Sequence, residues 1–471
     1  MTAPLADRFA AAQSTLDAIG QAQVLRYYDT LDDAGKDQLL TQIEGIDWDE
    51  LARLIESHVK QQPTIPLPEV IEPAPTYPAS PTADLEAKYT EAHALGEQLI
   101  RDGQVAAFCV AGGQGTRLGW DGPKGTFPGT PLREAPLFQV FAEYLLGIKA
   151  KYGTDVPLYL MTSDVNDADT RAFFEQNHHF GLDPANVMIF PQAMMPAMDM
   201  TTGDVLLADP ASMALSPNGH GGSLKALHTS GAIADMKTRG ITQVSYIQVD
   251  NPLVRVVDPL FIGLHALDHA QMSSKMIPKA GPLEKVGNFC LADGKVTVIE
   301  YSNLPDALAL STNDDGSLKF NAGSIAIHVI AVDFVEQLNA QGFGLPWNRA
   351  EKKVPHLDAD GNPVKPTEPN AVKLETFVFD ALPLCDTSIV YETLREDEFG
   401  PVKNASGDGV KDSPDTSKQL QSDRAAKWLT AAGVTVAPGT TCEISQALAV
   451  SPDDLKQHDL PDSIEGDYLL A

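Results

Sequence analysis

The sequence predicts an α/β protein, in which a mostly parallel sheet carries helices on both faces in a Rossmann-like, three-layer arrangement. Two observations predict this class. From residue 105 to about residue 330, short apolar runs alternate with segments of helical periodicity, an order typical of parallel sheets. Residues 105–111 are seven consecutive apolar or small residues, the pattern of a strand that is buried on both faces.

Each element of this alternation has its own signal in the sequence. Strands are predicted at 105–111, 157–162, 187–190 and 243–249, and helices at 136–151, 167–179 and 222–239. Residues 287–300 are predicted to form a hairpin around an Ala-Asp-Gly turn. Residues 320–324 (FNAGS) are predicted to form a turn of small residues. Because ligands bind beyond the carboxyl ends of strands in open parallel sheets, the residues that follow each strand are the candidates for a site.

The chain divides into four predicted parts. The first has helical periodicity, with Asp47 as the N-cap of one helix. The second carries seven prolines and is expected to be an extended connector. The third is the catalytic domain, and the fourth is a small C-terminal domain whose helix begins at Ser413-Pro414. Their bounds are 1–60, 61–84, 85–400 and 401–471.

Composition limits the function. The chain has 471 residues and a net charge of −30, which argues against binding to nucleic acid or to an anionic membrane. Four scattered cysteines fit buried thiols better than a disulfide framework or a zinc site. The N-terminus shows no signal peptide, and no apolar stretch approaches the length of a membrane span. We therefore expect a soluble, cytoplasmic protein, in which a divalent cation supports any polyphosphate site.

The first predicted strand breaks into Gly112-Gly113-Gln114-Gly115. Dense glycines let backbone amides turn toward a ligand, and a run of such amides binds anions. Arg117 and Lys124 add two cations nearby, so the stretch is a plausible phosphate cradle. Leu118 occupies the position of the third glycine of a Rossmann dinucleotide motif, and the Gly-Lys-Ser/Thr of a P-loop is missing. A purely structural glycine turn is the alternative.

Three further stretches contain candidate residues. Asp250 ends an apolar strand, where a carboxylate is well placed either to hold Mg²⁺ against a triphosphate or to begin a turn before Asn-Pro. His220 lies in a second glycine loop, SPNGHGGSLKAL, which opens a helix whose free amides favour anions. Gln192 offers both a donor and an acceptor, as recognition of a uracil edge requires. Lys403 ends LREDEFGPVKN, which is otherwise a typical solvated charge cluster.

Taken together, the motifs closely resemble those of the eukaryotic UDP-N-acetylglucosamine pyrophosphorylases, within the wider UTP–sugar-1-phosphate uridylyltransferase family. The resemblance runs from about residue 20 to about residue 445. The matching stretches are VAGGQGTRLG with PKG, QAMMPAM, NGHGG, VDN, KVGN, IEYS, FNAGS, AVKLETFVFD and LREDEFGPVKN.

The resemblance implies the fold of a nucleotide-diphospho-sugar transferase and a set of site residues. Catalytic cations would be Arg117, Lys124 and Lys403. The residues implied to bind UTP are Val110, Ala111, Gly112, Gly113, Lys124, Gln192, Gly219, Asp250 and Lys373, with Asp250 also holding Mg²⁺. Those implied to bind the sugar phosphate are His220, Gly287, Glu300, Asn321 and Lys403. The substrates would be UTP and N-acetylglucosamine-1-phosphate; the sequence predicts no oligomeric state.

The chain departs from the family pattern at His220 and Ser324, where the family carries asparagine in both cases, and in a shorter C-terminal region. His220 is more typical of the branches that make UDP-glucose or several UDP-sugars, so that activity is one alternative. A non-catalytic sensor of nucleotide sugars is another. A dinucleotide-dependent oxidoreductase does not fit Leu118. The conspicuous candidates are cations, glycines and one acid, which favours in-line attack on the α-phosphorus without a general base.

Overall fold

The computed structural model describes residues 3–63, 68–340 and 342–471. By packing, the chain forms two compact units. The smaller unit consists of Met1–Leu67, Gln192–Ser223 and Leu345–Val378, and the larger unit consists of Pro68–Pro191, Leu224–Gly344 and Phe379–Ala471. The four-part division of the sequence stays a prediction, because packing joins segments that lie far apart along the chain.

The larger unit is built on a ten-stranded sheet, whose main path has the order β1-β12-β14-β10-β2-β3-β4. Four of its strands run parallel to one another: β10 (Gln243–Gln248), β2 (Val105–Val110), β3 (Leu158–Thr162) and β4 (Val187–Pro191). These are the four predicted strands. All six residues of β2 are buried, as its unbroken apolar run predicts.

A second group of strands brings antiparallel pairs into this sheet. β14 (Ala322–Ala331) runs antiparallel to β10 and to β11 (Met272–Pro278), and β11 runs parallel to β19 (Ser388–Glu392). The prediction of a turn at 320–324 is therefore wrong, since a ten-residue strand begins at Ala322. Small residues stand there because β11 approaches closely: a Cβ at Gly323 would lie 3.1 Å from the Ile277 carbonyl oxygen.

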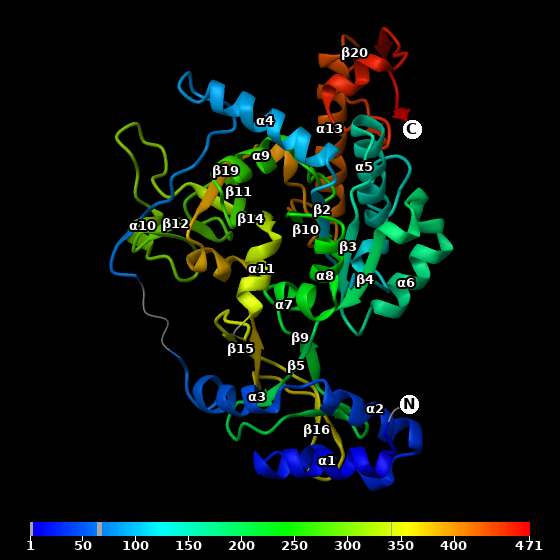
Figure 1. The fold of residues 1–471 in the computed structure, drawn as a ribbon, viewed down its shortest axis with the longest axis vertical. Coiled ribbons are helices and arrows are strands. Elements are labelled where there is room, and N and C mark those ends of the chain that lie inside the picture. Colours follow the sequence, from blue (N-terminus) through cyan, green and yellow to red (C-terminus); the bar gives the residue numbers. More distant parts are fainter. Residues whose placement is uncertain (1–2, 64–67, 341) are drawn as a thin grey trace. The chain divides into compact units, whose positions relative to one another are not determined.

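Helices cover both faces of the parallel strands, so the three-layer α/β prediction is confirmed (Figure 1). On one face, Val105, Ala107 and Cys109 of β2 belong to a core shared with α4 (Glu86–Arg101), α5 (Leu137–Tyr152), α6 (Asp167–Gln176) and α9 (Pro259–Leu267). On the other face, the Tyr159 hydroxyl of β3 donates to Asp235 of α8 (Ala232–Thr238) over 2.6 Å.

Two predicted helices end earlier than expected. The predicted helix 222–239 is two helices, α7 (Gly222–Thr229) and α8, because Gly231 between them has φ +84°. The predicted helix 167–179 is α6, which ends at Gln176, because His178 and His179 have φ of +50° and +53°. The left-handed region cannot continue a right-handed helix, so the chain turns at both places.

The edge of the sheet carries the predicted hairpin. β12 (Asn288–Ala292) pairs antiparallel with β13 (Lys295–Ile299). The two linking residues, Asp293 and Gly294, have φ of +47° and +81°, as a tight primed turn requires. Within the predicted connector, β1 (Ile71–Pro73) pairs with β12, while residues 64–67 lie outside the described residues.

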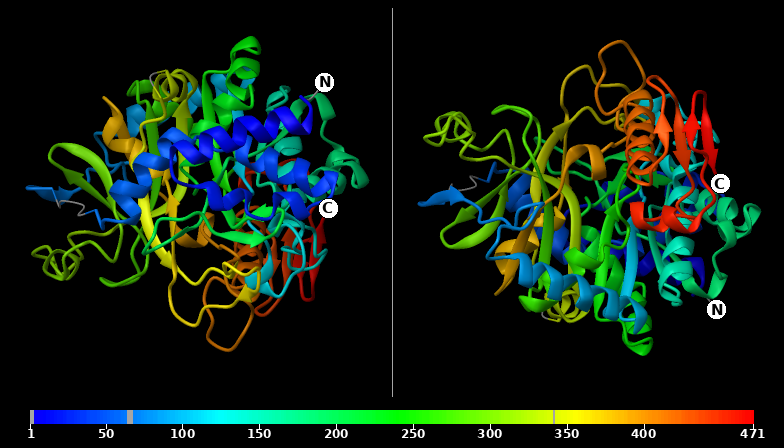
Figure 2. Two further views of the ribbon diagram at one scale, coloured as in Figure 1. Left: turned by 90° about the horizontal axis from the view of Figure 1, so that it is seen from below. Right: turned by 90° about the horizontal axis from the view of Figure 1, so that it is seen from above.

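The C-terminal part packs around α13 (Pro414–Ala431). Ser413 caps this helix and accepts a hydrogen bond from the Thr416 amide, with Pro414 in the first turn, as predicted. Four short strands follow in two parallel pairs beside α13 (Figure 2). They are β20 (Thr435–Val436), β21 (Cys442–Ile444), β22 (Ser463–Ile464) and β23 (Tyr468–Leu470). Three short helices complete the larger unit: α10 (Asp306–Ala309), α11 (Val332–Asn339) and α12 (Arg395–Glu398).

The smaller unit packs three N-terminal helices on short strands from two later segments. The helices are α1 (Leu5–Ala18), α2 (Asp33–Glu44) and α3 (Trp48–Leu54). The predicted N-cap at Asp47 is confirmed, since its side chain accepts from the Glu50 amide over 2.9 Å. The strands are β5 (Met194–Pro196), β6 (Met198–Asp199), β7 (Leu207–Asp209), β8 (Ser212–Met213), β9 (Leu215–Pro217), β15 (Asn348–Lys352), β16 (His356–Leu357), β17 (Pro363–Val364) and β18 (Ala371–Glu375).

Among the described residues, no helix combines the length and the apolar character that crossing a bilayer would require.

Candidate active site

The glycine turn after β2 is fixed through its carbonyl groups. The Asn166 Nδ2 donates to the carbonyl oxygens of Ala111 and Gly113, at 2.9 Å and 3.3 Å. The Ser163 hydroxyl donates to the Gly112 carbonyl oxygen at 2.9 Å. Asn166 and Ser163 are both buried at the end of β3, so the neighbouring strand holds the turn in one conformation.

The amide groups of the same turn are left open. Across the described ranges, the amides of Gly112, Gly113 and Gln114 donate to no protein acceptor. A Cβ at Gly113 would have no atom within 4 Å, so the backbone there is accessible. Consecutive amides with unused N–H groups form a nest for an anion. The structure thus supports the phosphate cradle over a purely structural glycine turn.

Two other glycines of this stretch are needed for packing. A Cβ at Gly115 would lie 2.7 Å from Trp120 Cβ, and a Cβ at Gly125 would lie 2.1 Å from the Phe138 ring. The Trp120 indole nitrogen in turn donates to the Thr126 hydroxyl over 2.9 Å. The Lys124 amide also donates to the Gly113 carbonyl oxygen. Together these contacts fold residues 113–126 back on themselves.

Lys124 and Asp250 come together beside this turn. Lys124 Nζ lies 3.6 Å from Asp250 Oδ2, and both side chains are mostly buried. Asp250 follows β10, the neighbour of β2, so both residues lie at the carboxyl edge of the parallel strands. Arg117 is exposed on a short 3₁₀ turn (Thr116–Leu118) and has no ion pair with a described residue.

The surroundings of Asp250 fit one particular mode of magnesium binding. Among the described residues, no group of three or more His, Cys, Asp and Glu side chains lies close enough together to hold a metal ion. Magnesium commonly binds through one or two carboxylates and takes its other ligands from water and substrate phosphates. Asp250 beside the open amides of the glycine turn matches that mode.

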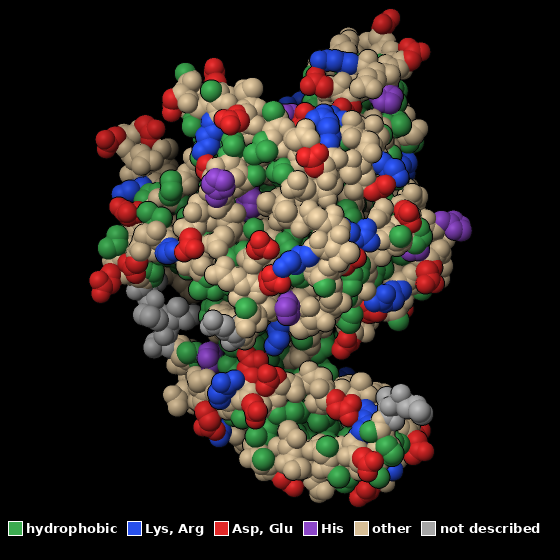
Figure 3. All heavy atoms as spheres, viewed as in Figure 1, with side chains coloured by type: hydrophobic (Ala, Val, Ile, Leu, Met, Phe, Trp, Pro, Cys, Tyr) green, Lys and Arg blue, Asp and Glu red, His purple; other side chains and the backbone are tan. Residues whose placement is uncertain are grey.

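Lys403 lies at a pocket of about 740 Å³ within the larger unit. Three stretches line this pocket: 280–286, 395–403 and 411–420. The Lys403 ammonium lies 5.4 Å from the centre of the Phe399 ring, and the Lys403 amide donates to the Asp412 carbonyl oxygen over 2.7 Å. Four Lys or Arg side chains and two acidic side chains line this pocket, on a molecule with 64 Asp and Glu against 34 Lys and Arg. Figure 3 shows acidic side chains spread over the visible face.

Two of the residues assigned to the sugar lie together. A Cβ at Gly287 would lie 3.5 Å from Glu300 Oε1 and 3.7 Å from Ser324 Cβ. Ser324, where the chain departs from the family pattern, therefore faces the same small space as Glu300. Burial raises the pKa of Glu300, which favours its protonated form.

Asn321 leads to a residue that the sequence did not identify. Asn321 Oδ1 accepts from the Lys279 amide at 3.0 Å. Lys279 is buried, and its ammonium donates to Asn288 Oδ1 at 2.6 Å and to the Pro282 carbonyl oxygen at 3.3 Å. Burial lowers its pKa, and no described carboxylate lies within ion-pair distance. A lone lysine between proline and alanine gives no sequence signal that it will be buried beside Asn321.

The smaller unit holds the second glycine loop. Gly219 has φ +85°, and a Cβ there would lie 2.3 Å from the Thr376 carbonyl oxygen. His220 Nδ1 accepts from the Val378 amide at 3.1 Å, and its ring stacks on Phe377 with centroids 5.3 Å apart. Burial lowers the pKa of His220 to about 4. The imidazole is therefore neutral at pH 7, with its proton on Nε2.

Gln192 and Lys373 also belong to the smaller unit. Gln192 is buried, and in the part of the chain that the structure describes, its Oε1 accepts no hydrogen bond. A buried acceptor without a donor is costly, which points to a donor supplied by a ligand. Lys373 lies on β18 opposite Ala350 of β15, and burial lowers its pKa.

An open α/β sheet with an amide-lined turn, a lysine and a carboxylate at its carboxyl edge defines a nucleotide-binding protein of the α/β class. The family model described as UTP–glucose-1-phosphate uridylyltransferase matches residues 47–412. The chain belongs to this family and is a nucleotidyltransferase. The family resemblance, the fold class and the prediction of an enzyme are thereby confirmed.

Similar proteins cover nearly the whole chain. UDP-N-acetylhexosamine pyrophosphorylase-like protein 1 of Xenopus tropicalis is 36% identical over 450 residues, which are 92% of this chain and 87% of that protein. UDP-N-acetylglucosamine pyrophosphorylase of Saccharomyces cerevisiae is 36% identical over 379 residues, 79% of each chain. The inhibitor-bound uridine diphosphate N-acetylglucosamine pyrophosphorylase of Trypanosoma brucei has a TM-score of 0.83 and 28% identity, and the match covers 100% of this chain and 99% of that one.

Proposed function

We propose that this protein transfers the uridylyl group of UTP to N-acetylglucosamine-1-phosphate and releases pyrophosphate. The observation that carries the proposal is the set of open amides at 112–114 beside Lys124 and Asp250. The names of the relatives from Xenopus tropicalis and Saccharomyces cerevisiae support an N-acetylhexosamine as the sugar. The substrates are then two small molecules.

The reaction requires no general base from the protein. An oxygen of the sugar phosphate, already anionic, forms a bond to the α-phosphorus of UTP. The bond from the α-phosphorus to the bridging oxygen breaks in line, and pyrophosphate leaves with the electron pair. The protein then contributes by positioning the two phosphates and by neutralising their charge, for which we assign Arg117, Lys124, Lys373 and Lys403.

Each remaining residue has a proposed task. Asp250 would hold Mg²⁺, which when bound neutralises charge on the triphosphate. The turn Val110–Gly113 would bind the nucleotide through its backbone. In the smaller unit, Gln192 and Gly219 are assigned to the uracil, and the unpaired Oε1 of Gln192 suits the N–H of that base. Gly287, Glu300, Asn321 and His220 are assigned to the sugar.

The decisive experiment compares three acceptors. Purified protein is supplied with UTP, Mg²⁺ and either N-acetylglucosamine-, N-acetylgalactosamine- or glucose-1-phosphate, and pyrophosphate release is measured. We expect the highest kcat/KM with N-acetylglucosamine-1-phosphate. A preference for glucose-1-phosphate would instead indicate a UDP-glucose or broad UDP-sugar enzyme. Binding of UDP-sugar without pyrophosphate release from any acceptor would indicate a sensor and overturn the proposal.

A further inference from the structure

The stretch that carries Lys403 is attached to the end of β10 through one side chain. Asn251, which follows Asp250, is 4% exposed. Its Nδ2 donates to the Glu398 carbonyl oxygen at 2.7 Å, and its Oδ1 accepts from the Gly400 amide at 3.1 Å. The side-chain amide thus bonds to 398–400 as a neighbouring backbone peptide would.

A third hydrogen bond continues this pairing toward the site. The Val402 amide donates to the Asp250 carbonyl oxygen over 2.7 Å. Three hydrogen bonds within five residues fix the register of 398–402 against the end of β10, and Lys403 is the next residue. The same strand end places the Asp250 carboxylate 3.6 Å from Lys124 Nζ. The position of Lys403 relative to Asp250 therefore depends on Asn251.

A buried charge cluster holds the first residue of this stretch. The Glu398 carboxylate accepts from Lys275 Nζ at 2.6 Å and 2.7 Å and from the Thr393 hydroxyl at 2.9 Å. Lys275 Nζ also lies 2.6 Å from Asp258 Oδ2. Lys275, Glu398 and Asp258 are all buried. Because an unpaired buried charge is costly, Glu398 cannot move away from Lys275 cheaply.

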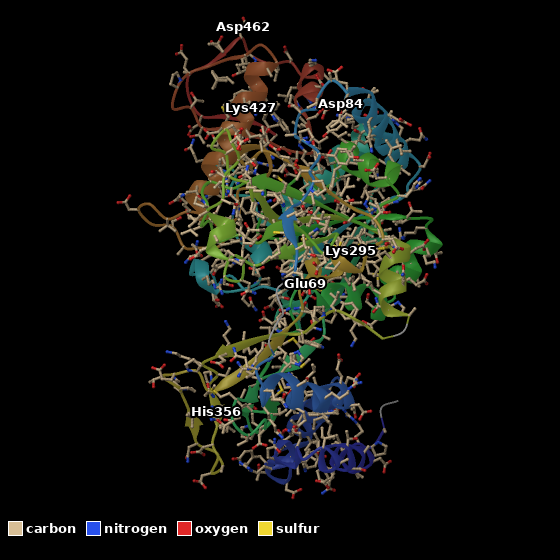
Figure 4. All side chains as sticks on the ribbon, turned by 90° about the vertical axis from the view of Figure 1, so that its left-hand side faces the viewer. Glu69, Asp84, Lys295, His356, Lys427 and Asp462 are labelled. Carbon is tan, nitrogen blue, oxygen red and sulfur yellow. The ribbon has the colours of Figure 1, made fainter. Side chains whose placement is uncertain are left out.

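The helix α13 supports the outer side of the same stretch. The Ser417 hydroxyl donates to the Gly400 carbonyl oxygen at 2.6 Å, and Arg424 donates to the Asp397 carbonyl oxygen at 3.0 Å. Lys427, labelled in Figure 4, forms an ion pair with Asp397 at 2.9 Å. With these contacts the backbone of 397–400 is fixed from two sides, while the Lys403 side chain stays exposed.

We propose that Asn251 is a positioning residue, which sets the position of Lys403 relative to Asp250 so that both act on the same reacting phosphates. The role of Lys403 in this inference rests on the proposed function. Asn251 touches neither substrate; it acts through the backbone of 398–402.

A double-mutant cycle tests whether Asn251 acts through Lys403. Four proteins are compared: wild type, Asn251→Ala, Lys403→Ala and the double variant, with kcat and both KM values measured. We expect Asn251→Ala to lower kcat/KM for the sugar phosphate by about 10-fold to 100-fold. The KM for UTP should stay within about 2-fold, and the double variant should match Lys403→Ala within about 2-fold. Multiplicative effects of the two substitutions would overturn the proposal.

The matched control is Asn339→Ala. Asn339 of α11 also donates from its side-chain amide to backbone carbonyl oxygens, those of Val335 at 2.8 Å and Leu224 at 3.2 Å. Its removal should leave the kinetics of the sugar phosphate unchanged and combine independently with Lys403→Ala. If Asn339→Ala lowered kcat/KM as Asn251→Ala does, the effect would be general destabilisation and the proposal would be wrong.

Hydrogen exchange gives a readout that does not depend on activity. Asn251→Ala should speed exchange of the Gly400 and Val402 amides and leave the amides of β2 and β3 as in wild type. Unchanged protection of the Gly400 and Val402 amides would refute the positioning role. Inactivity of the wild type with every sugar phosphate would refute only the proposed function, and the exchange measurement could still be made. If Asn251→Ala did not fold, Asn251→Asp, which keeps the acceptor for Gly400 but loses the donor to Glu398, is tested by the same double-mutant cycle with Lys403→Ala.

Discussion

At the scale of single residues, a substitution of Arg117 should change the activity without changing the stability of the fold. Its side chain is exposed and makes no ion pair with a described residue. Arg117→Ala should therefore lower kcat by about 100-fold, the scale of losing one preorganised charge contact, without changing thermal unfolding. Pyrophosphate release and the melting temperature measure the two effects. Arg53→Ala, at another exposed arginine, should change neither; a near-wild-type rate for Arg117→Ala would remove Arg117 from the mechanism.

His220 predicts a pH dependence of stability. Burial lowers its pKa in the folded protein from 6.5 to about 4. Between these values the unfolded chain binds more protons than the folded one, so the stability that this residue contributes decreases as the pH falls from 6.5 to 4. In His220→Asn, the free energy of unfolding should fall less steeply with acidification.

Urea unfolding at several pH values between 4 and 7.5 measures that slope. The same substitution at exposed His228 should leave the slope as in wild type. An identical slope in His220→Asn and wild type would mean that this imidazole is protonated alike in the folded and unfolded chain, contrary to the desolvation of its ring in the folded protein.

The individual site residues were only partly predictable. Arg117, Lys124 and Asp250 follow a glycine turn or a strand end, so the sequence marks them. Lys403 lies in a run that is otherwise typical of a charge cluster, and only the family resemblance indicated it. The partners of these residues were not predictable. Asn251 lies in the VDN motif together with Asp250, but its proposed role depends on Glu398 and Gly400, almost 150 residues later. The sequence also did not indicate that folding would bury Lys279 with its ammonium bonded to Asn288.

At the scale of elements, α4 and α9 are in such close contact that adding one methyl group at Gly263 should greatly lower the stability of the fold. A Cβ at Gly263 would lie 1.7 Å from the Ala92 carbonyl oxygen, and a Cβ at Gly96 would lie 1.8 Å from that of Pro259. Backbone atoms cannot yield as a flexible side chain can, so the two helices must separate. Gly263→Ala should lower the free energy of unfolding by about 1–3 kcal/mol or more.

Denaturant unfolding measures this effect, with Gly466→Ala as the control in the same unit. A Cβ at Gly466 would have no atom within 4 Å, and that substitution should change stability by less than about 0.5 kcal/mol. Equal stability of Gly263→Ala and wild type would show that the helices can move apart without cost.

Elements were predictable where burial leaves a strong pattern. The four parallel strands are mostly apolar because they lie between layers of helices, and each was found at nearly its observed bounds. β14 was not predicted as a strand: its first residues, Ala322, Gly323 and Ser324, are small, as turn residues are, and were predicted to form a turn. Their size there reflects the approach of β11, a contact between segments that are distant in the sequence.

At the scale of the whole molecule, the α/β class followed from the order of elements, whereas the grouping into units did not. The N-terminal helices share a core with Met198, Val372 and Leu374. Gln21 accepts from the Val205 amide at 2.8 Å, a contact across 184 residues. Local periodicity carries no information about such partners, so the sequence could describe the first helices but not what they pack against.

The composition of the smaller unit from three separate stretches has a practical consequence. The polypeptide passes between the two units five times, at residues 67/68, 191/192, 223/224, 344/345 and 378/379. Trimming either terminus therefore cannot yield the smaller unit as an intact fragment. Deleting its N-terminal helices would expose Met198, Val372 and Leu374, which share a core with those helices. To isolate it, an experimenter would have to splice three pieces with new loops.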